Sequence, residues 1–323
     1  MEGNIESLRT IPVFTSISEE TLRSLALLLK ENKYLKGEYI IREGEQADSM
    51  YILHSGEVEV RKVIDSKTGK YKILAILEEG DVFGEMAVFG EKFRSADVVA
   101  RKDCSLWKID CSDLFDVINT DPKSGIRLLE VIIAILISRI KSLNRELTTL
   151  YELGRLIPQA EDINALTGMV FEQLMNDIEP AKAGFIAIWN KYNEEFDIYQ
   201  SANIKKVHHI EKSDPVAVWI LENKSSLLIK DTGIEKRFKD RFYSGRSMIA
   251  SPLIYNGEIT GFILLSNPSR KNAFTYSHMV LLSTACNQVT ARLKEIERRG
   301  EEKLRERLGE GKLMVSLYPT VGP

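Results

Sequence analysis

The spacing of hydrophobic and polar positions changes several times along the chain, and each change marks a predicted element. Near the N-terminus, leucines at helical spacing follow Ser16 and Ser18, which are both candidate helix caps. Over residues 34–106 the chain changes to short β-rich runs separated by glycines, and Val58 and Val60 alternate with polar residues. Many short strands with closely spaced glycine turns predict a small antiparallel barrel or jelly roll.

A long helix is predicted after Pro122, where apolar residues recur at alternating steps of four and three. This spacing is the heptad seam of a coiled coil, and isoleucine at a with leucine at d favours a parallel two-stranded coil. We therefore expect a homodimer; the alternative is a single amphipathic helix that lies on its own domain. The seam residues are Ile133, Ile140 and Leu147 at a, and Leu129, Leu136, Leu143 and Leu150 at d.

The second half of the chain mixes helices and strands in a pattern typical of an α+β domain. A helix is predicted over residues 162–177, and a closing helix over residues 277–296. Strands are predicted at 248–255 and 258–265, and the Asn256-Gly257 pair between them is a strong hairpin signal.

Together these patterns predict an α+β multidomain protein with four segments. Residues 1–122 are expected to form a β-roll or jelly-roll domain with flanking helices, followed by a long lid or linker helix at 123–157, a parallel coiled coil. Residues 158–297 are expected to form an antiparallel sheet with flanking helices. The last segment, 298–323, belongs to a charge-dense tail that predicts a solvated or coiled helix.

Composition narrows the classes of function. The 323 residues are 44% hydrophobic and 28% charged, which is ordinary for soluble domains. The net charge of −3 does not favour nucleic-acid binding through phosphate contacts. The most apolar run, 128–137, is too short to span a bilayer, and the polar N-terminus does not resemble a secretory signal. Three cysteines without CxxC spacing favour a reducing cytoplasm.

Motifs for catalysis and metal binding are missing from the sequence. It contains no nucleophile elbow, HExxH or Walker loop. His208 and His209 are adjacent, so on a strand they would point to opposite faces, and no third ligand clusters near them. We expect no catalytic residue, no metal site and no enzyme activity.

Candidate binding chemistry lies in residues 80–96. Gly80 and Gly84 permit a tight turn and close approach of the backbone to a ligand. A helical turn starting at Glu85 would present free N–H groups to an anion. Arg94 is expected on the next strand, where a guanidinium beside backbone N–H donors makes a good phosphate receptor. The carboxylate of Glu85 would repel a phosphate, but it can accept hydrogen bonds from hydroxyl groups such as those of a ribose.

This stretch resembles the phosphate-binding cassette of the cyclic-nucleotide-binding domain family. In that family F-G-E-x-A is followed, after a short loop, by an arginine, a small residue and an alanine. The matching residues here are Phe83-Gly84-Glu85-Met86-Ala87 and Arg94-Ser95-Ala96. The resemblance covers about residues 5–145 and implies a β-roll that binds a 3′,5′-cyclic nucleotide.

The resemblance also implies roles for single residues. Glu85 would accept the ribose 2′-OH, and Arg94 would pair with the exocyclic oxygens of the cyclic phosphate. Backbone N–H groups near Ala87 and Ala96, with the Ser95 hydroxyl, would complete the phosphate site. The hydroxyl of Ser95 is compatible with either purine, and we favour cAMP over cGMP.

The base and the lid are assigned by the same resemblance. Val60 and Leu74 correspond to positions that pack under the base, and Arg139 of the long helix lies near the position that reaches the base. Phe93 and Asp97 depart from the family pattern, which often has a proline and a neutral residue there. If the neighbours of Asp97 face inward, alternation turns Asp97 to solvent. The alternative is a cassette that binds nothing, with its carboxylate and guanidinium joined as a structural ion pair.

The second half of the chain resembles a GAF domain, a sensory α+β module, over about residues 150–297. The matching segments are residues 227–231, 237–238, 245–253 and 256–265, Phe274 and the closing helix. The resemblance implies a fold and leaves the ligand open. Asn267, Lys271 and Phe274 distantly resemble the signature of nucleotide-binding GAF domains, but a plain polar loop is the simpler interpretation.

The sequence therefore predicts a cytoplasmic, non-enzymatic signal sensor that binds a cyclic nucleotide and transmits occupancy through a helical linker to a GAF domain and possible downstream signalling proteins. Upon binding, the hinge near Phe115 to Ile118 and the long helix are expected to move toward the barrel as a lid. Three alternatives stay open. They are the regulatory portion of a larger or partnered cyclase or kinase, a ligand-free dimerisation scaffold, and a transcription regulator of the catabolite-activator superfamily.

Overall fold

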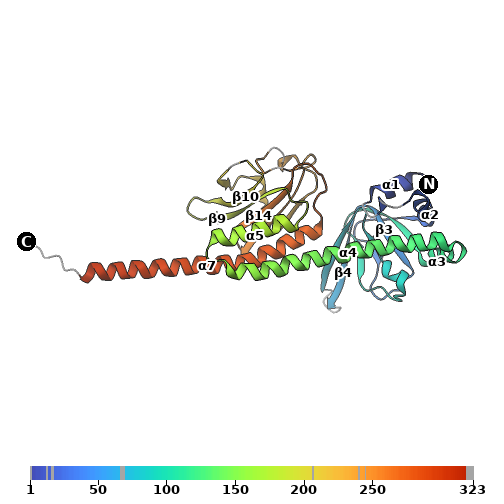
Figure 1. Ribbon diagram of the computed structural model, residues 1–323, viewed down its shortest axis with the longest axis horizontal. Helices are drawn as coiled ribbons and strands as arrows, with labels where there is room; N and C mark the ends of the chain where they lie inside the picture. The colour runs from blue at the N-terminus through green and yellow to red at the C-terminus, as the bar shows by residue number, and fades with distance from the viewer. Residues whose placement is uncertain are drawn as a thin grey trace, which may run out of the picture. The chain divides into compact units, whose positions relative to one another are not determined.

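The computed structural model divides the chain into two compact units, Met1–Leu143 and Asn144–Pro323 (Figure 1). It describes residues 2–11, 14–15, 18–65, 70–205, 207–238, 241–243 and 245–317. Each unit has its own hydrophobic cores. Every cluster of buried apolar residues consists of residues from one unit only. The predicted α+β multidomain architecture is confirmed.

The first unit is a β-roll of two antiparallel sheets, as the glycine-punctuated strands predict. Within the described residues the strand orders are β1-β8-β3-β6 and β2-β7-β4-β5. The strands are β1 (Lys30–Tyr34), β2 (Tyr39–Ile41), β3 (Ser49–Ser55), β4 (Glu57–Asp65), β5 (Lys70–Glu78), β6 (Val82–Phe83), β7 (Asp97–Ala100) and β8 (Cys104–Asp110).

Helices flank this β-roll. Ser18 caps the second of them, since its side chain accepts a hydrogen bond from the Thr21 N–H, whereas the other candidate cap, Ser16, lies outside the described residues. The helices are α1 (Glu2–Thr10), α2 (Glu19–Leu28), the 3₁₀ helix η2 (Glu85–Phe89), α3 (Cys111–Thr120) and α4 (Pro122–Leu156).

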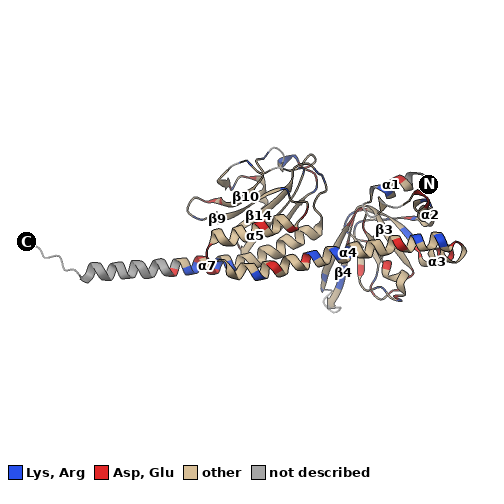
Figure 2. Ribbon diagram, viewed as in Figure 1, with Lys and Arg blue, Asp and Glu red and all other residues tan. Residues whose placement is uncertain are grey.

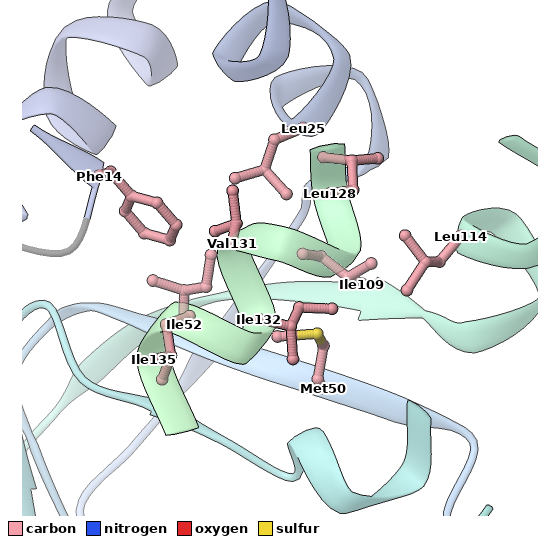
Figure 3. A pocket seen from close by; sticks show the side chains of 10 residues that line it. All are labelled: Phe14, Leu25, Met50, Ile52, Ile109, Leu114, Leu128, Val131, Ile132 and Ile135. Atoms are coloured by element: carbon pink, nitrogen blue, oxygen red, sulfur yellow. The ribbon is translucent and has the colours of Figure 1, made fainter. Parts of the chain in front are cut away.

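The start of α4 is fixed to the β-roll by apolar packing. Leu128, Val131, Ile132 and Ile135 are buried among side chains of α2, β3 and β8. Figure 3 shows these residues around a small pocket whose lining is entirely apolar, so the pocket is part of the core. This packing sets the orientation of the following turn of α4, which contains Arg139.

The second unit is built on a six-stranded antiparallel sheet with strand order β11-β10-β9-β14-β13-β12. Its strands are β9 (Ala183–Asn190), β10 (Glu195–Ala202), β11 (His209–Glu211), β12 (Leu227–Ile229), β13 (Ser247–Tyr255) and β14 (Glu258–Asn267). Its helices are η3 (Ile157–Gln159), α5 (Ile163–Asp177), α6 (Pro215–Asn223), η4 (Lys236–Phe238) and α7 (Tyr276–Leu317).

The hairpin and the two-sided burial of this sheet follow from its sequence. Asn256 and Gly257 have φ values of 49° and 81° and join β13 to β14, as this pair favours. Along β14, Ile263 belongs to the cluster that α5 and α7 cover, whereas Phe262 belongs to the cluster on the α6 side. This alternation has the period of two that a strand with two buried faces requires.

The long helix differs from its predicted seam. Leu129 and Leu150 pack against the cores of their own units, and Leu136 is half-buried, so most d positions are used within the chain. All three predicted a positions and Leu143 are exposed. The exposed apolar stripe of α4 consists of Ile126, Ile133, Ile137, Ile140, Leu143, Leu147 and Tyr151. All of these residues except Leu143, which is at d, occupy positions a and e of the heptad.

Charges are distributed along both long helices. Figure 2 shows acidic and basic residues interspersed along α4 and along the described part of α7. The helix α7 continues without a break across residue 297, the predicted boundary between the domain and the charged tail. Among the described residues, no helix combines the length and apolarity needed to cross a membrane.

The first turn of α7 contains a pH-sensitive cap, which yields a prediction. The Thr275 N–H donates to Nδ1 of His278 over 3.1 Å, which requires that nitrogen to be unprotonated. Burial lowers the pKa of His278 below its ordinary value of 6.5, and the Arg145 cation adds to this shift while Glu179 opposes it.

Because the unfolded chain binds this proton more readily, the free energy of unfolding should decrease as the pH falls below 6.5. The decrease should be about 1.4 kcal/mol for each unit by which the pKa is lowered. Urea unfolding of wild type and His278→Gln between pH 5 and pH 8 measures it. Equal pH dependence in both proteins would contradict this account of the cap.

Candidate functional site

The loop after β6 buries a carboxylate beside the β-roll. Gly84 has a φ of 75° and leads into η2, which begins with Glu85. The Glu85 side chain is only 10% exposed, and its Oε1 accepts a hydrogen bond from Nη1 of Arg139 over 2.8 Å. Arg139 lies on α4, so the lid helix contacts the cassette in this structure.

The guanidinium of Arg94 is also buried next to this loop, and its Nη1 donates to the Gly84 carbonyl over 3.4 Å. Its Nη1 donates to the backbone carbonyl of Ser49 over 2.7 Å, and its Nη2 donates to the Ser49 hydroxyl over 3.0 Å. Its acidic neighbour is Asp48, at 3.5 Å, whose side chain is 66% exposed. A water-exposed carboxylate at this distance screens a buried cation only weakly.

The cassette is not closed by an internal ion pair. In the part of the chain that the structure describes, Glu85 pairs with Arg139 and Arg94 pairs with Asp48, and no ion pair joins Glu85 to Arg94. The proposed alternative of a carboxylate and guanidinium locked to each other is therefore contradicted. The two groups stay separate, as a ligand with a phosphate at one end and hydroxyls at the other would need.

Two residues of β3 that sequence reasoning missed complete the surroundings of Arg94. Ser49 is fully buried and provides two of the hydrogen bonds of the guanidinium. The ring of Tyr51 stacks on Phe83 with 5.2 Å between centroids, and the guanidinium carbon of Arg94 lies 5.9 Å from the Tyr51 centroid. A serine at the start of an apolar strand is the only signal that could have indicated Ser49.

The other residues that the resemblance assigns to the phosphate site differ in their exposure. Ala87 and Ala96 are buried, Ser95 is exposed, and Met86 is exposed on η2. The Ala87 N–H, which the resemblance assigns to the phosphate, donates to the Gly84 carbonyl over 3.2 Å. The expected free donor is therefore engaged, because a 3₁₀ helix closes bonds between residues three apart.

The two base-contacting positions lie on neighbouring strands. Val60 is half-buried and packs against the core of the β-roll. It pairs with Ala75, whereas the next pair joins Arg61 to Ile73, so Leu74 falls in a bulge without a partner. Leu74 is 52% exposed and lies outside the packed core.

Asp97 lies on the outward face that alternation predicts, but it is not exposed to solvent there. Asp97 is buried instead of solvent-facing, and its Oδ1 accepts a hydrogen bond from the Glu43 N–H over 2.8 Å. Its other oxygen lies 3.8 Å from Nε of Arg61, whose guanidinium stacks on the Tyr39 ring. These side chains cover the outer face of the sheet, so the charge of Asp97 is compensated there.

In the second unit, the contacts of residues 267–274 favour a plain polar loop over a nucleotide-binding signature. The Asn267 side chain donates to the Pro180 carbonyl over 2.7 Å and accepts a hydrogen bond from the Arg270 N–H over 2.9 Å. Phe274 is buried in the core with α5 and α7, and Lys271 is exposed. In the described ranges, no three metal-ligating side chains come together.

Both resemblances are confirmed by family models. Residues 31–121 match the model of the cyclic nucleotide-binding domain, and residues 166–293 match the model of the GAF domain. The chain therefore contains a cyclic nucleotide-binding domain followed by a GAF domain.

Two cGMP-dependent protein kinases and a solved cyclic nucleotide-binding domain are similar to parts of the chain. The chain is 35% identical over 94 residues to the cGMP-dependent protein kinase egl-4 of Caenorhabditis elegans. The matched segment makes up 29% of this chain and 12% of the kinase. It is 31% identical over 96 residues to human cGMP-dependent protein kinase 2, again with 12% of that kinase. A cyclic nucleotide-binding domain from Methylobacillus flagellatus is 23% identical, with a TM-score of 0.38, over 49% of this chain and 83% of that domain.

Gly84 should be required for the position of Arg94. A Cβ at residue 84 would lie 2.9 Å from Nη1 of Arg94 and 3.2 Å from the Ser49 carbonyl, whereas a Cβ at Gly37 would meet open space. Both glycines have positive φ, so alanine at either site costs about 1–2 kcal/mol. Gly84→Ala should cost about 1–3 kcal/mol more, through the displaced guanidinium.

Hydrogen exchange of β3 and β8 amides in the two variants measures this difference in stability. The matched control is Gly37→Ala, which has the backbone penalty without the collision. Equal losses of protection in both variants would contradict the close approach of Gly84 to Arg94.

Proposed function

We propose that this protein is a non-enzymatic signal sensor that binds a 3′,5′-cyclic nucleotide in its first unit and transmits occupancy through α4 to its GAF domain. The observation that carries the proposal is the separation of Arg94 and Glu85. Both are buried beside Gly84, and each is held by a group other than its counterpart. The three free, buried cysteines support a role in the reducing cytoplasm.

The two buried groups suit the two ends of such a ligand. A guanidinium has five N–H donors, and Arg94 uses some of them for Ser49, the Gly84 carbonyl and Asp48; a remaining donor can reach an anionic phosphate. The carboxylate of Glu85 has a second oxygen beside the one that Arg139 uses, and it can accept from a ribose hydroxyl. The choice of ligand would then come from a phosphate and a 2′-OH at a fixed separation.

The contacts proposed for the sugar and the phosphate do not determine which base the site prefers. We favour cAMP from the sequence, whereas the two similar kinases are named for cGMP. The exposed side chain of Ser95 is compatible with either purine. Both nucleotides are therefore titrated in the experiment below, and the tighter ligand identifies the messenger.

Transmission is proposed to use the continuity of α4. This helix runs from Pro122 to Leu156 as one element, with Leu128 in a core of the first unit and Leu153 in a core of the second. A ligand that favours one arrangement of the helix over another changes the population of that arrangement in proportion to its differential affinity.

A second candidate function is the regulatory portion of a larger or partnered signalling enzyme. The two relatives described are protein kinases, and the matched segment is 12% of their length. This observation favours an enzyme partner, and it would leave the role of the nucleotide site unchanged.

Arg94→Ala should weaken cyclic nucleotide binding about 10- to 100-fold, because it removes charge-assisted hydrogen bonds to the phosphate. Isothermal calorimetry with cAMP and with cGMP measures the change. The matched control is Arg101→Ala, which removes an exposed arginine from the same unit and should leave binding unchanged. Heat release unaffected by Arg94→Ala would remove Arg94 from the site.

We also propose that the exposed apolar stripe of α4 joins two copies of the chain. A stripe of isoleucine, leucine and tyrosine over about three heptads is long enough for a two-stranded coil. The d positions Leu129 and Leu150 are already used, so the proposed seam is formed mainly by positions a and e, together with the exposed d residue Leu143.

Ile133→Lys combined with Ile140→Lys should convert the dimer to a monomer, because the change places charges in the middle of the stripe. The control is Ser138→Lys combined with Ser142→Lys, which adds the same charge to another exposed face of α4. Light scattering should give the monomer mass for the first variant and the dimer mass for the control and wild type. A dimer that survives the isoleucine substitutions would place the interface elsewhere.

A further inference from the structure

We infer that Asp97 is a positioning residue of the phosphate site, which fixes the backbone of Arg94 from the outer face of the β-roll. Asp97 departs from the family pattern, which often has a neutral residue at this position, so the resemblance assigns it no role. The inference rests on the proposed function, and it concerns how the same site acquires its affinity for a phosphate.

The turn that follows β2 holds the backbone of Arg94 on both sides of its Cα. The Gly44 N–H donates to the Arg94 carbonyl over 2.9 Å, and the Arg94 N–H donates to the Glu45 carbonyl over 2.8 Å. Gly44 has a φ of 82°, which favours glycine and allows the tight turn. These two bonds fix where the Arg94 side chain begins, and the contacts with Ser49 fix where its guanidinium lies.

The carboxylate of Asp97 holds that turn in place. Its Oδ1 accepts a hydrogen bond from the Glu43 N–H over 2.8 Å, and Glu43 directly precedes Gly44. The pairing of β2 with β7 ends where Ile41 lies opposite Val98, so it does not extend to Glu43. An acceptor on the side chain of residue 97 therefore takes the place of the next bond of the ladder.

A second contact between the same segments is weaker. The Glu43 carboxylate lies 3.4 Å from Nζ of Lys62, which donates to the Ser95 carbonyl over 3.4 Å. These two side chains are 35% and 54% exposed, whereas that of Asp97 is 10% exposed. Because exposed ion pairs contribute little to stability, the buried bond of Asp97 contributes more to holding the turn than this ion pair does.

The charge of Asp97 is balanced on the outer face of the sheet. The next residue, Val98, belongs to the core inside the β-roll, so Asp97 points away from that core. Its second oxygen lies 3.8 Å from Nε of Arg61, and the Arg61 guanidinium stacks on the ring of Tyr39. The influence of Asp97 on Arg94 therefore passes through the position of the turn and not through direct contact.

The test is a double-mutant cycle between Asp97 and Arg94. Isothermal calorimetry measures the affinity for the cyclic nucleotide that binds more tightly. Asp97→Ala should weaken binding about tenfold in the wild-type background and less than about twofold in Arg94→Ala, because Asp97 acts through Arg94. Asp97→Asn should keep the affinity within about twofold of wild type, because its amide oxygen still accepts a hydrogen bond from the Glu43 N–H.

Glu59→Ala is the matched control. Glu59 pairs with the same arginine, with 3.2 Å between its Oε1 and Nη1 of Arg61, and its side chain is 13% exposed. The substitution removes a similarly buried carboxylate from the same face of the sheet and leaves the Glu43 N–H paired. It should therefore leave the affinity for the nucleotide unchanged.

Amide hydrogen exchange of the nucleotide-free protein measures the anchoring itself. The Gly44 and Arg94 amides should exchange about tenfold faster in Asp97→Ala than in wild type, Asp97→Asn and Glu59→Ala, while the amides of β8 keep their protection. Asp97→Val fills the same space without an acceptor, and it repeats both measurements if the alanine variant does not fold.

Two outcomes would overturn the inference. Equal weakening by Asp97→Ala in both backgrounds would mean that the acid contributes only to general stability. Unchanged exchange of the Arg94 amide would mean that the turn does not depend on Asp97. If wild type binds neither cAMP nor cGMP, the proposed function fails, and the exchange measurement still decides whether Asp97 anchors Arg94.

Discussion

The separate anchoring of two buried charges is the constraint on which the account of this protein depends. A buried ion is stable only when it is paired or fully hydrogen-bonded. Arg94 is hydrogen-bonded to the carbonyl and hydroxyl of Ser49 and lies 3.5 Å from Asp48, and Glu85 is paired with Arg139. Because neither charge needs the other, both stay available to a ligand that carries a phosphate and a ribose.

Different faces of α4 make different contacts, and the helix thereby connects the binding site to the rest of the chain. One face is buried in the first unit through Leu128 and Ile135, and the next turn holds Arg139 against the cassette. Another face presents Ile133 and Ile140 to solvent. Ligand binding and self-association would therefore act on the same element, which is what a sensor with a helical output requires.

The sequence predicted those parts of the molecule that local rules determine. The glycine-punctuated strands, the hairpin at Asn256-Gly257 and the start of α4 after Asp121 were all predictable from turn chemistry and periodicity. Contacts between distant segments were not, because no local pattern specifies them. Ser49 lies 45 positions from the arginine that it anchors, and the burial of Asp97 was not predicted because Arg61 and Tyr39 cover its face of the sheet.

The most direct measurement of the central claim is a crystal structure of the full chain grown with the tighter-binding cyclic nucleotide. The account predicts an exocyclic phosphate oxygen within hydrogen-bond distance of the Arg94 guanidinium. It also predicts the 2′-OH on the Glu85 carboxylate while Arg139 remains on the other oxygen. A nucleotide bound elsewhere, or seated in the β-roll with its phosphate remote from Arg94, would contradict the account.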